Sequence, residues 1–568
     1  MRYMLHRLLA ALFAFATVLP AAGQALPDLA PRDVEIRGEL TISFPSLRRQ
    51  PLVGFNPPPR VPDIGLRRMP FVERYKQRGT ELPQNPLANP TTPRDLPRTA
   101  GSGFTGTFET GFGRYATRYA LLEASLFASP VSRWTVAGRY DGTTSFAPFG
   151  SDAAADGFTG STRFASSGPS VSYGVEALGS SDSYTLYGID LPGSVGTVVA
   201  PNRTRSDLLG SAWLGTGSAS SVSLNLRLDG YSGSNSTGAF VGTVDSRNER
   251  SNSGAKATLS MQASAVKLDA SAGALTLDSA SNPGRAVGHY DAGGAFKLRL
   301  GSTASAEFGG RVLGFEALPV ASGSTRRSIS YFSPSMELEA ALAPNLRLEV
   351  SQRPSLGSAN PGDLFRDQPF LVDEVQIEPV IYTVDAMARL RGFWSTLQAS
   401  AIVGYKESPN WRVFEHDSAN FTGYPQGLSR VRHTAARVVT VGGEMRLSPT
   451  PGFEARLGGR FQNGRLTDLK TDLPYLPDWT VEGMISQAFA KRKGLVQATT
   501  ALLGKRPRDT VGGEPVSTFA DLDVRISYAV ATNGLVIAEL RNLLGETPYW
   551  YNYPEAPATV VVGLGWRW

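Results

Sequence analysis

The side chains best suited to catalysis are few and scattered in this sequence. The chain has four histidines, His6, His289, His416 and His433, and it has no cysteine. The lack of cysteine excludes disulfides and thiolate metal sites. A Ser-His-Asp triad needs a nucleophile turn and a spaced acid, and none accompanies the many serines. We therefore predict no enzymatic activity, no catalytic or metal site and no cofactor.

Charged residues recur at every second position of short apolar segments. In 222–229, four apolar residues alternate with Ser223, Asn225, Arg227 and Asp229. Successive side chains of a strand point to opposite faces, so each segment would have one apolar and one charged face. The charged set could grip a filler, line a passage or simply form a hydrated wall. It comprises Arg133, Arg139, Asp141, Arg227, Asp229, Lys297, Arg299, Asp521, Asp523 and Arg525.

Aromatic residues crowd two of the longer connections between these segments. Such side chains suit stacking on a ligand or contact with a partner. The alternative is an aromatic belt at a membrane interface together with packing of the loops on themselves. The first group is Trp411, Phe414, Phe421 and Tyr424, and the second is Tyr549, Trp550, Tyr551 and Tyr553.

The last nine residues, VVVGLGWRW, show the same alternation in its clearest form. Val560, Val562, Leu564, Trp566 and Trp568 are apolar, whereas the residues between them are mostly small or polar. The pattern fits a strand in the core of a soluble sandwich. It equally fits a strand facing lipid, with tryptophans at the interface and Arg567 pointing into a lumen.

The spacing of the connections distinguishes these two architectures. Short links at 129–132, 262–264, 300–303, 491–494 and 531–534 tend to alternate with long ones at 353–380, 406–432, 463–478, 504–516 and 544–557. A meander with short turns at one end and long loops at the other explains that alternation. We therefore predict an all-β fold: a closed antiparallel transmembrane β-barrel of about 22 strands (range about 18–24) over residues 101–568.

The N-terminal hundred residues differ from the rest of the chain. Residues 1–25 carry Arg2 and Arg7, then an apolar run and small residues, which is the layout of a secretory signal peptide. Residues 26–100 hold 14 of the 39 prolines. Proline removes ladder donors and blocks helix interiors, so we expect an extended periplasmic arm rich in Pro and Arg.

The C-terminal segment from Phe519 to Trp568 resembles the end of the barrel of TonB-dependent outer-membrane receptors. The matching stretches are FADLDVRISYAV, LVIAELRNLLGETPYW and YPEAPATVVVGLGWRW, with a corner at Asn542, Leu543, Leu544 and Gly545. The final strand is also similar to the signal that the barrel-assembly machinery reads, with Gly563, Trp566 and Trp568 in the matching positions. Ala556, Pro557 and Ala558 replace the usual Gly-Arg pair, and Val561 replaces a polar residue.

The resemblance implies an outer-membrane protein of a diderm bacterium that transports or binds a bulky solute. Receptors of this class carry a globular plug before the barrel, and residues 26–100 are too short and too proline-rich for one. No TonB box is recognisable, so coupling to TonB is doubtful.

The alternatives are a plugless scaffold filled by a protein partner, bound through residues 26–100, and a passive porin-like channel. Membrane lipid and the assembly machinery are the other expected partners. The net charge of +6 over 568 residues gives no indication of nucleic-acid binding.

Overall fold

The structure is a computed structural model that describes most of the chain from residue 104 onward. The described residues are 104–144, 154–186, 202–216, 222–238, 248–279, 282–317, 327–357, 360–371, 378–416, 428–507, 515–545, 549–550, 553–554 and 557–568. The predicted signal peptide and the arm at 26–100 lie outside them. No helix in the described part is long and apolar enough to cross a membrane.

A single antiparallel sheet of 22 strands contains most of the described residues. The predicted fold class and strand number are therefore confirmed. Its first half contains β1 (Thr105–Gly113), β2 (Arg118–Ala128), β3 (Ser132–Thr143), β4 (Ala155–Ser167), β5 (Val171–Thr185), β6 (Asn202–Thr216), β7 (Val222–Thr237), β8 (Asn248–Ala263), β9 (Val266–Ser279), β10 (Asn282–Leu300) and β11 (Ala304–Ala317). Its second half contains β12 (Arg327–Ala343), β13 (Leu346–Gln352), β16 (Val384–Phe393), β17 (Leu397–His416), β18 (Ser429–Leu447), β19 (Phe453–Leu466), β20 (Trp479–Phe489), β21 (Gly494–Leu503), β22 (Phe519–Ala529), β23 (Gly534–Arg541) and β26 (Thr559–Arg567).

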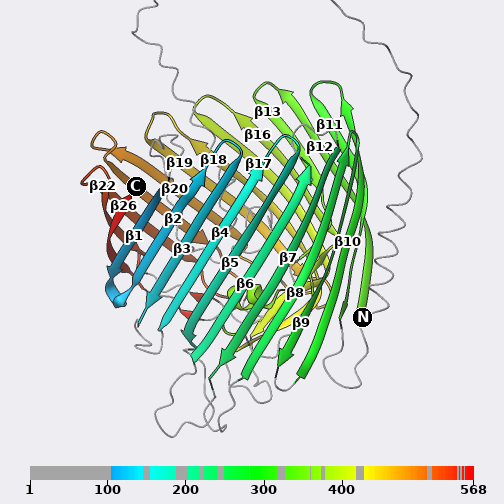
Figure 1. Ribbon diagram of the computed structural model, residues 1–568, viewed down its shortest axis with the longest axis horizontal. Coiled ribbons are helices and arrows are strands. Elements are labelled where there is room, and N and C mark those ends of the chain that lie inside the picture. Colours follow the sequence, from blue (N-terminus) through cyan, green and yellow to red (C-terminus); the bar gives the residue numbers. More distant parts are fainter. Residues whose placement is uncertain are drawn as a thin grey trace, which may run out of the picture. The chain divides into compact units, whose positions relative to one another are not determined.

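The sheet is closed because the last strand pairs with the first. β26 pairs with β23 on one side and with β1 on the other, and Phe108 of β1 lies opposite Trp566. Figure 1 shows β1 in blue beside β26 in red. Closure leaves no unpaired strand edge, which a sheet in lipid could not tolerate. Beyond the strand, the backbones of Gly106 and Trp568 exchange two hydrogen bonds of 3.1 Å.

The long connections all lie at one end of the barrel, which also has the short links 114–117 and 280–281, and the links at the other end are all short. Links of a few residues, such as 129–131, 264–265, 344–345 and 530–533, follow the strands that run in one direction. Long links, such as 353–383 and 467–478, follow the strands that run in the other direction. We call these the turn end and the loop end, and the turn end is uppermost in Figure 1. In bacterial outer-membrane barrels, the short turns face the periplasm and the long loops face outward.

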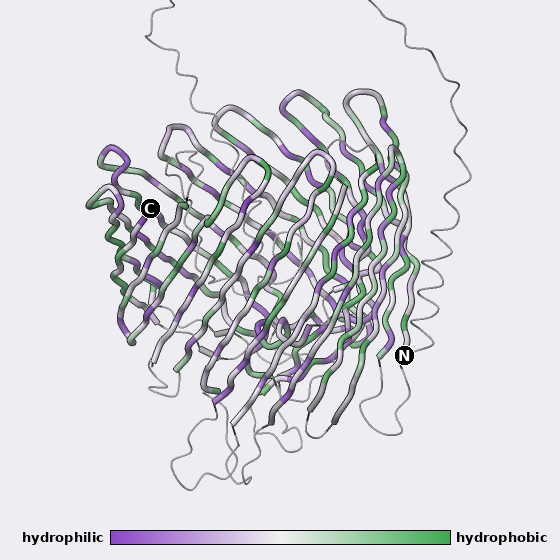
Figure 2. The backbone as a smooth tube through the Cα atoms, in the orientation of Figure 1, coloured by the Kyte–Doolittle hydropathy of each residue, from purple (hydrophilic) through white to green (hydrophobic). Residues whose placement is uncertain are grey.

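The two faces of the wall differ in composition, as the period-two pattern predicts. Along β26, Val560, Val562, Leu564 and Trp566 are exposed, and the residues between them are covered. Figure 2 shows the same alternation of apolar and polar residues around the barrel. Because apolar side chains of this size are exposed on strand after strand, we assign that face to lipid and the opposite face to the interior.

Shorter elements occur in the connections. A 3-10 turn, η2 (Arg114–Ala116), joins β1 to β2. The connection from β13 to β16 contains β14 (Ser355–Leu356), helix α3 (Pro361–Asp367) and β15 (Ile381–Tyr382), and the final connection contains β24 (Tyr549–Trp550) and β25 (Tyr553–Pro554). The α3 sequence carries the expected signals: Asn360 caps its N-terminus by accepting a hydrogen bond from the Gly362 N–H at 2.8 Å, and Pro361 follows at the first position.

Candidate functional site

The connection between β13 and β16 folds into the loop end of the barrel. Helix α3 and the residues after it contact β6 through side chains of the interior face. That face is identified by the burial pattern of β6, in which Arg203 and Arg205 are buried while Leu208 and Leu214 are exposed toward lipid. A connection held by interior side chains lies within the barrel, so it covers part of the mouth.

Arg203 is the main attachment between the wall and this connection. It is 0% exposed. Its Nη1 donates to the Pro369 carbonyl at 2.6 Å, and its Nη2 donates to the Leu371 carbonyl at 2.8 Å. Its Nε donates to Thr237 Oγ1 at 3.0 Å, and its guanidinium lies over the Phe365 ring. A planar guanidinium with several donors can hold two carbonyls in fixed positions, which a lysine could not do equally well.

A second attachment surrounds the start of α3. Arg205 forms ion pairs with Asp182 and, at 3.1 Å, with Asp207. Tyr231 donates to Asp207 at 2.6 Å. A Cβ placed on Gly362 would meet Asp207 Oδ1 at 2.4 Å, so α3 packs directly against this group. The lack of a side chain at position 362 is therefore what permits the close approach of the helix to the wall.

Three further contacts fix the rest of the connection. Arg412 of β17 pairs with Asp367 at 3.0 Å, and Arg327 of β12 pairs with Glu378 at 2.9 Å. Asn410 of β17 is fully buried, and it bonds the backbone on both sides of residue 380: its Nδ2 donates to the Pro379 carbonyl at 2.8 Å, and its Oδ1 accepts from the Ile381 N–H at 2.8 Å. The connection is therefore attached to at least three separate parts of the wall.

Apolar clusters complete the assembly at the loop end. One cluster joins the α3 region to residues from β9, β17 and β18 and from other connections. Its buried members are Leu186, Leu275, Leu364, Phe365, Phe370, Leu371, Phe414, Leu428, Val431, Tyr475 and Val516. A second cluster contains Val380, Tyr382, Trp411, Val413, Ala436, Val438, Leu466, Leu473 and Leu476. Both draw on several long connections, so the loops pack on one another as a small core. We call this set of connections the loop assembly.

The β17–β18 hairpin belongs to the loop assembly, which corrects the expectation of a loop over 406–432. A bulge between Ser408 and Trp411 interrupts the pairing, and the strands then continue to His416 and Ser429. Trp411 and Phe414, expected in an exposed loop, are instead buried strand residues in two different clusters. The bulge shifts the alternation of apolar and polar residues by one position. Beyond it, β17 is buried on both faces, so its residues do not alternate and the sequence pattern did not predict this part of the strand.

The other aromatic residues proposed as loop contacts cannot be placed in the same way. Phe421, Tyr424 and Tyr551 lie outside the described residues. Tyr549 and Trp550 form the short strand β24.

Most of the predicted interior charges lie on the interior face, where the structure pairs them. Arg139 pairs with Asp141, and Arg227 pairs with Asp229 at 2.8 Å. Other pairs on the same face involve residues that were not predicted, such as Arg311 with Asp291 at 2.8 Å and Lys406 with Asp385 at 3.2 Å. Arg133 and Arg299 lie on β3 and β10 in phase with these residues. Because these cations are paired with carboxylates, the wall is better described as charge-balanced than as cationic. Each partly hydrated pair contributes little to the stability of the barrel.

Arg525 belongs to a group of charges beside the closing strand. Its Nη2 lies 2.6 Å from Glu109 of β1, and its Nη1 bonds Glu539 of β23, which also binds Arg541 at 2.7 Å. Asp523 accepts from the Asn542 N–H at 2.8 Å. Arg525 and Asp523 of β22 therefore contact the closing part of the barrel and the corner after β23.

The histidines that the structure places lie in different strands. His289 and His433 lie in β10 and β18, and the side chain of His416 is outside the described part. Among the residues that the structure describes, no group of three or more His, Cys, Asp or Glu side chains is placed to hold a metal ion.

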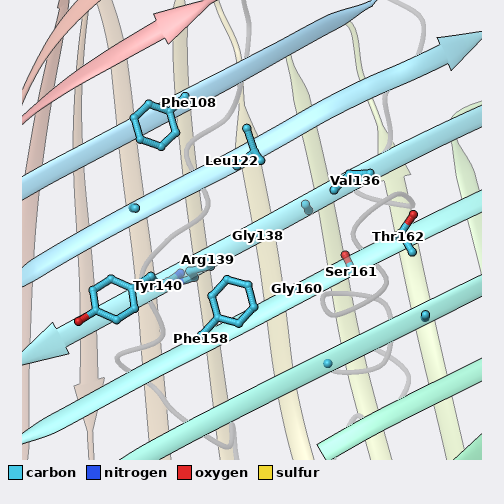
Figure 3. A pocket seen from close by; sticks show the side chains of 14 residues that line it. Phe108, Leu122, Val136, Gly138, Arg139, Tyr140, Phe158, Gly160, Ser161 and Thr162 are labelled. Carbon is cyan, nitrogen blue, oxygen red and sulfur yellow. The ribbon is translucent and has the colours of Figure 1, made fainter.

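An apolar hollow of about 410 Å³ lies on the lipid-facing side of β1 to β5. Figure 3 shows Gly138 and Gly160 near its centre, with Phe108, Leu122 and Phe158 around them. Gly138 and Gly160 are register partners on β3 and β4. Two glycines side by side leave a shallow dip between larger neighbours, which lipid chains can fill.

The described barrel is similar to solved structures of outer-membrane transporters and receptors. The FrpB iron transporter from Neisseria meningitidis has a TM-score of 0.63 at 10% identity, with 83% of this chain and 82% of that chain covered. The copper transporter OprC has a TM-score of 0.60 at 12% identity, covering 83% and 81%. The siderophore receptor PiuA from Acinetobacter baumannii has a TM-score of 0.60 at 11% identity, covering 83% and 82%.

These likenesses confirm the predicted resemblance at the level of fold: the chain has the 22-stranded barrel of TonB-dependent outer-membrane receptors. No protein-family model matches the sequence, and no curated protein is detectably similar to it. The structural neighbours are transporters and receptors, and their fold supports an outer-membrane location.

Proposed function

We propose that this protein carries or binds a bulky solute at the outer membrane, through a barrel whose mouth its own loops close. The observation that carries the proposal is the attachment of the β13–β16 connection to Arg203, which is fully buried and bonds the carbonyls of Pro369 and Leu371. Barrels of 22 strands are wide enough to need a filling inside. A closure formed by the connections, and not by the strands of the wall, can open locally without unfolding of the wall.

A passive porin-like channel is the first competing function. It requires an open lumen, and the loop assembly covers part of the mouth with an apolar core and several attachments. That observation favours regulated passage over free diffusion. The interior wall below the assembly carries paired charges, which suit a polar cargo surrounded by water.

A plugless scaffold that holds a partner protein is the second competing function. Residues 26–100, with their prolines and arginines, are the segment that we propose for contact with a partner or with the lumen. Coupling to TonB forms no part of the proposal, since the sequence has no recognisable TonB box. Gly563, Trp566 and Trp568 remain our proposed assembly signal.

Single-channel recording on the mature protein in planar bilayers tests the proposal. We expect a silent barrel with rare, brief openings of large conductance, because the loop assembly must detach before ions pass. Large steady conductance would favour the porin. Silence together with a stoichiometric protein that co-purifies from the membrane would favour the scaffold.

A further inference from the structure

Two arginines from neighbouring strands face outward near the loop end. Arg437 of β18 and Arg465 of β19 are direct register partners. Both are exposed, and they are in phase with Val441 and Phe461, which are exposed on the lipid-facing side. The pair therefore lies on the outer surface of the barrel, apart from the charges of the interior.

Three successive rows on this surface run from apolar to charged. The first row is Val403, Val441, Phe461 and Trp479; the second is Tyr405, Val439 and Asn463; the third is Glu407, Arg437 and Arg465. Rows on one face are two residues apart, or about 7 Å. Tryptophan and tyrosine are enriched where hydrocarbon meets headgroups. The third row therefore lies at the level of the lipid headgroups, on the loop-end side of the membrane.

The charge of this pair is only partly compensated by neighbouring side chains. Within the described residues, Arg437 forms no ion pair. Arg465 approaches Asp472 at 3.7 Å, and both side chains are more than half exposed. Glu407 accepts a hydrogen bond from the Tyr405 hydroxyl at 2.9 Å. Like charges directly opposite on an antiparallel pair repel each other, and an anion bound between them would relieve that repulsion.

The surface around Arg437 and Arg465 is also hollowed. A depression of about 270 Å³ is lined by Tyr405, Arg437, Val439, Asn463 and Arg465. Arg437, Asn463 and Arg465 can donate hydrogen bonds to a ligand there, whereas the Tyr405 hydroxyl already donates to Glu407. Two guanidinium forks with an amide nearby suit a tetrahedral phosphate, which accepts paired N–H donors.

We propose that this depression binds the phosphate group of an outer-leaflet lipid. The phosphate lies between Arg437 and Arg465, and the acyl chains of the same molecule extend along the apolar row below. The position at the headgroup level selects a membrane lipid over a soluble phosphate compound, since the acyl chains keep their contact with Val441 and Phe461. The site is on the outer wall, so it is independent of passage through the lumen.

Binding of labelled diphosphoryl lipid A to the folded full-length barrel in detergent tests this proposal. Chemically dephosphorylated lipid A and inorganic phosphate are the comparison probes. We expect the wild-type barrel to bind the phosphorylated lipid at least about tenfold more tightly than the dephosphorylated one. The double variant R437Q/R465Q should lose that difference. The matched control K491Q/R492Q removes two positive charges at the turn end and should keep it.

The proposal is overturned if the wild type does not distinguish the two lipids, or if R437Q/R465Q binds as the wild type does. Displacement of the lipid by an equal concentration of inorganic phosphate would also overturn it, in favour of a site for free phosphate. Heat-modifiable migration in gels establishes that each variant is folded. If the double variant fails that check, the single variants R437Q and R465Q replace it, each with an expected loss of about threefold or more.

Discussion

The guanidinium of Arg525 lies 2.6 Å from the carboxylate of Glu109, although 416 residues separate them in the chain. Arg525 is on β22 and Glu109 is on β1, with β23 and β26 between them in the sheet. The interior face of β26 presents Gly563 and Gly565 there, so no side chain of β26 intervenes. The ion pair therefore ties the first and last parts of the barrel together across the closing strand.

Replacement of Arg525 should loosen this closure. In Arg525→Met, the carboxylates of Glu109 and Glu539 would face each other without the shared cation. Breaking a largely buried pair by removing one partner costs about 3 kcal/mol. We expect the midpoint of urea unfolding, followed by heat-modifiable migration, to fall clearly. Arg227→Met, in the more exposed pair with Asp229, is the control and should shift the midpoint much less. If both variants shift the unfolding midpoint equally, the ion pair of Arg525 with Glu109 has no special role in closing the barrel.

Gly563 should tolerate no side chain, for a packing reason. A Cβ at this position would lie 2.5 Å from the Thr110 carbonyl oxygen and 2.8 Å from the Tyr119 hydroxyl. We expect Gly563→Val to destabilise the barrel by about 3 kcal/mol, because the strands β1 and β26 must separate to admit it. Refolding from urea into detergent measures this without the assembly machinery, so a lost assembly signal cannot account for the effect.

Gly230→Val is the matched control for this substitution. Gly230 lies on the outer face of β7, and an added Cβ there would meet nothing within 4 Å. Its refolding yield should equal that of the wild type or exceed it, since valine favours strands. If Gly563→Val refolds as well as Gly230→Val, the close approach of Thr110 and Tyr119 to position 563 does not affect the stability of the barrel.

Removal of the Arg203 side chain should release the loop assembly. Arg203→Met leaves the carbonyls of Pro369 and Leu371 buried without their donor, at a cost of about 3 kcal/mol for the attached state. The population of detached loops should then rise about a hundredfold. In planar bilayers we expect frequent large openings, with the unfolding midpoint of the barrel almost unchanged. Arg118→Met, which breaks the ion pair with Asp156 on the outer face, should leave conductance as it was.

Deletion of residues 30–95 tests the two roles that we propose for the arm. If the arm fills the lumen, the deleted protein should show higher conductance, and cells that carry it should become more sensitive to large antibiotics. An unchanged conductance with loss of a partner from pull-downs would reject lumen filling and support a tether. Combination with Arg203→Met separates the arm from the loops: a further rise in conductance means that both contribute to closure.

Much of the barrel follows from local sequence pattern. Period-two alternation in segments such as 222–229 and 560–566 assigned one face to lipid and the other to the interior. The pattern predicts these strands because each of them has one face toward lipid and the other toward the barrel interior. The alternation of short and long connections then indicated a closed meander. The extension of β17 was not predicted because residues 410–415 are covered on both faces and a bulge between Ser408 and Trp411 interrupts the alternation.

Local sequence pattern thus predicts the wall: a chain without cysteine, strands with an apolar outer face, and a last strand fit to close the sheet. Only the tertiary structure decided what the interior side chains bind. Arg203 and Arg205 are not among the interior charges predicted from the sequence, and α3 falls within a connection predicted only as a long loop. Their contacts with Leu371 and Gly362 form only when β6 and residues 360–371 come together in the fold. The physical reason is that alternation reports the environment of one strand, whereas an ion pair such as Arg525 with Glu109 depends on register and curvature accumulated over the whole sheet.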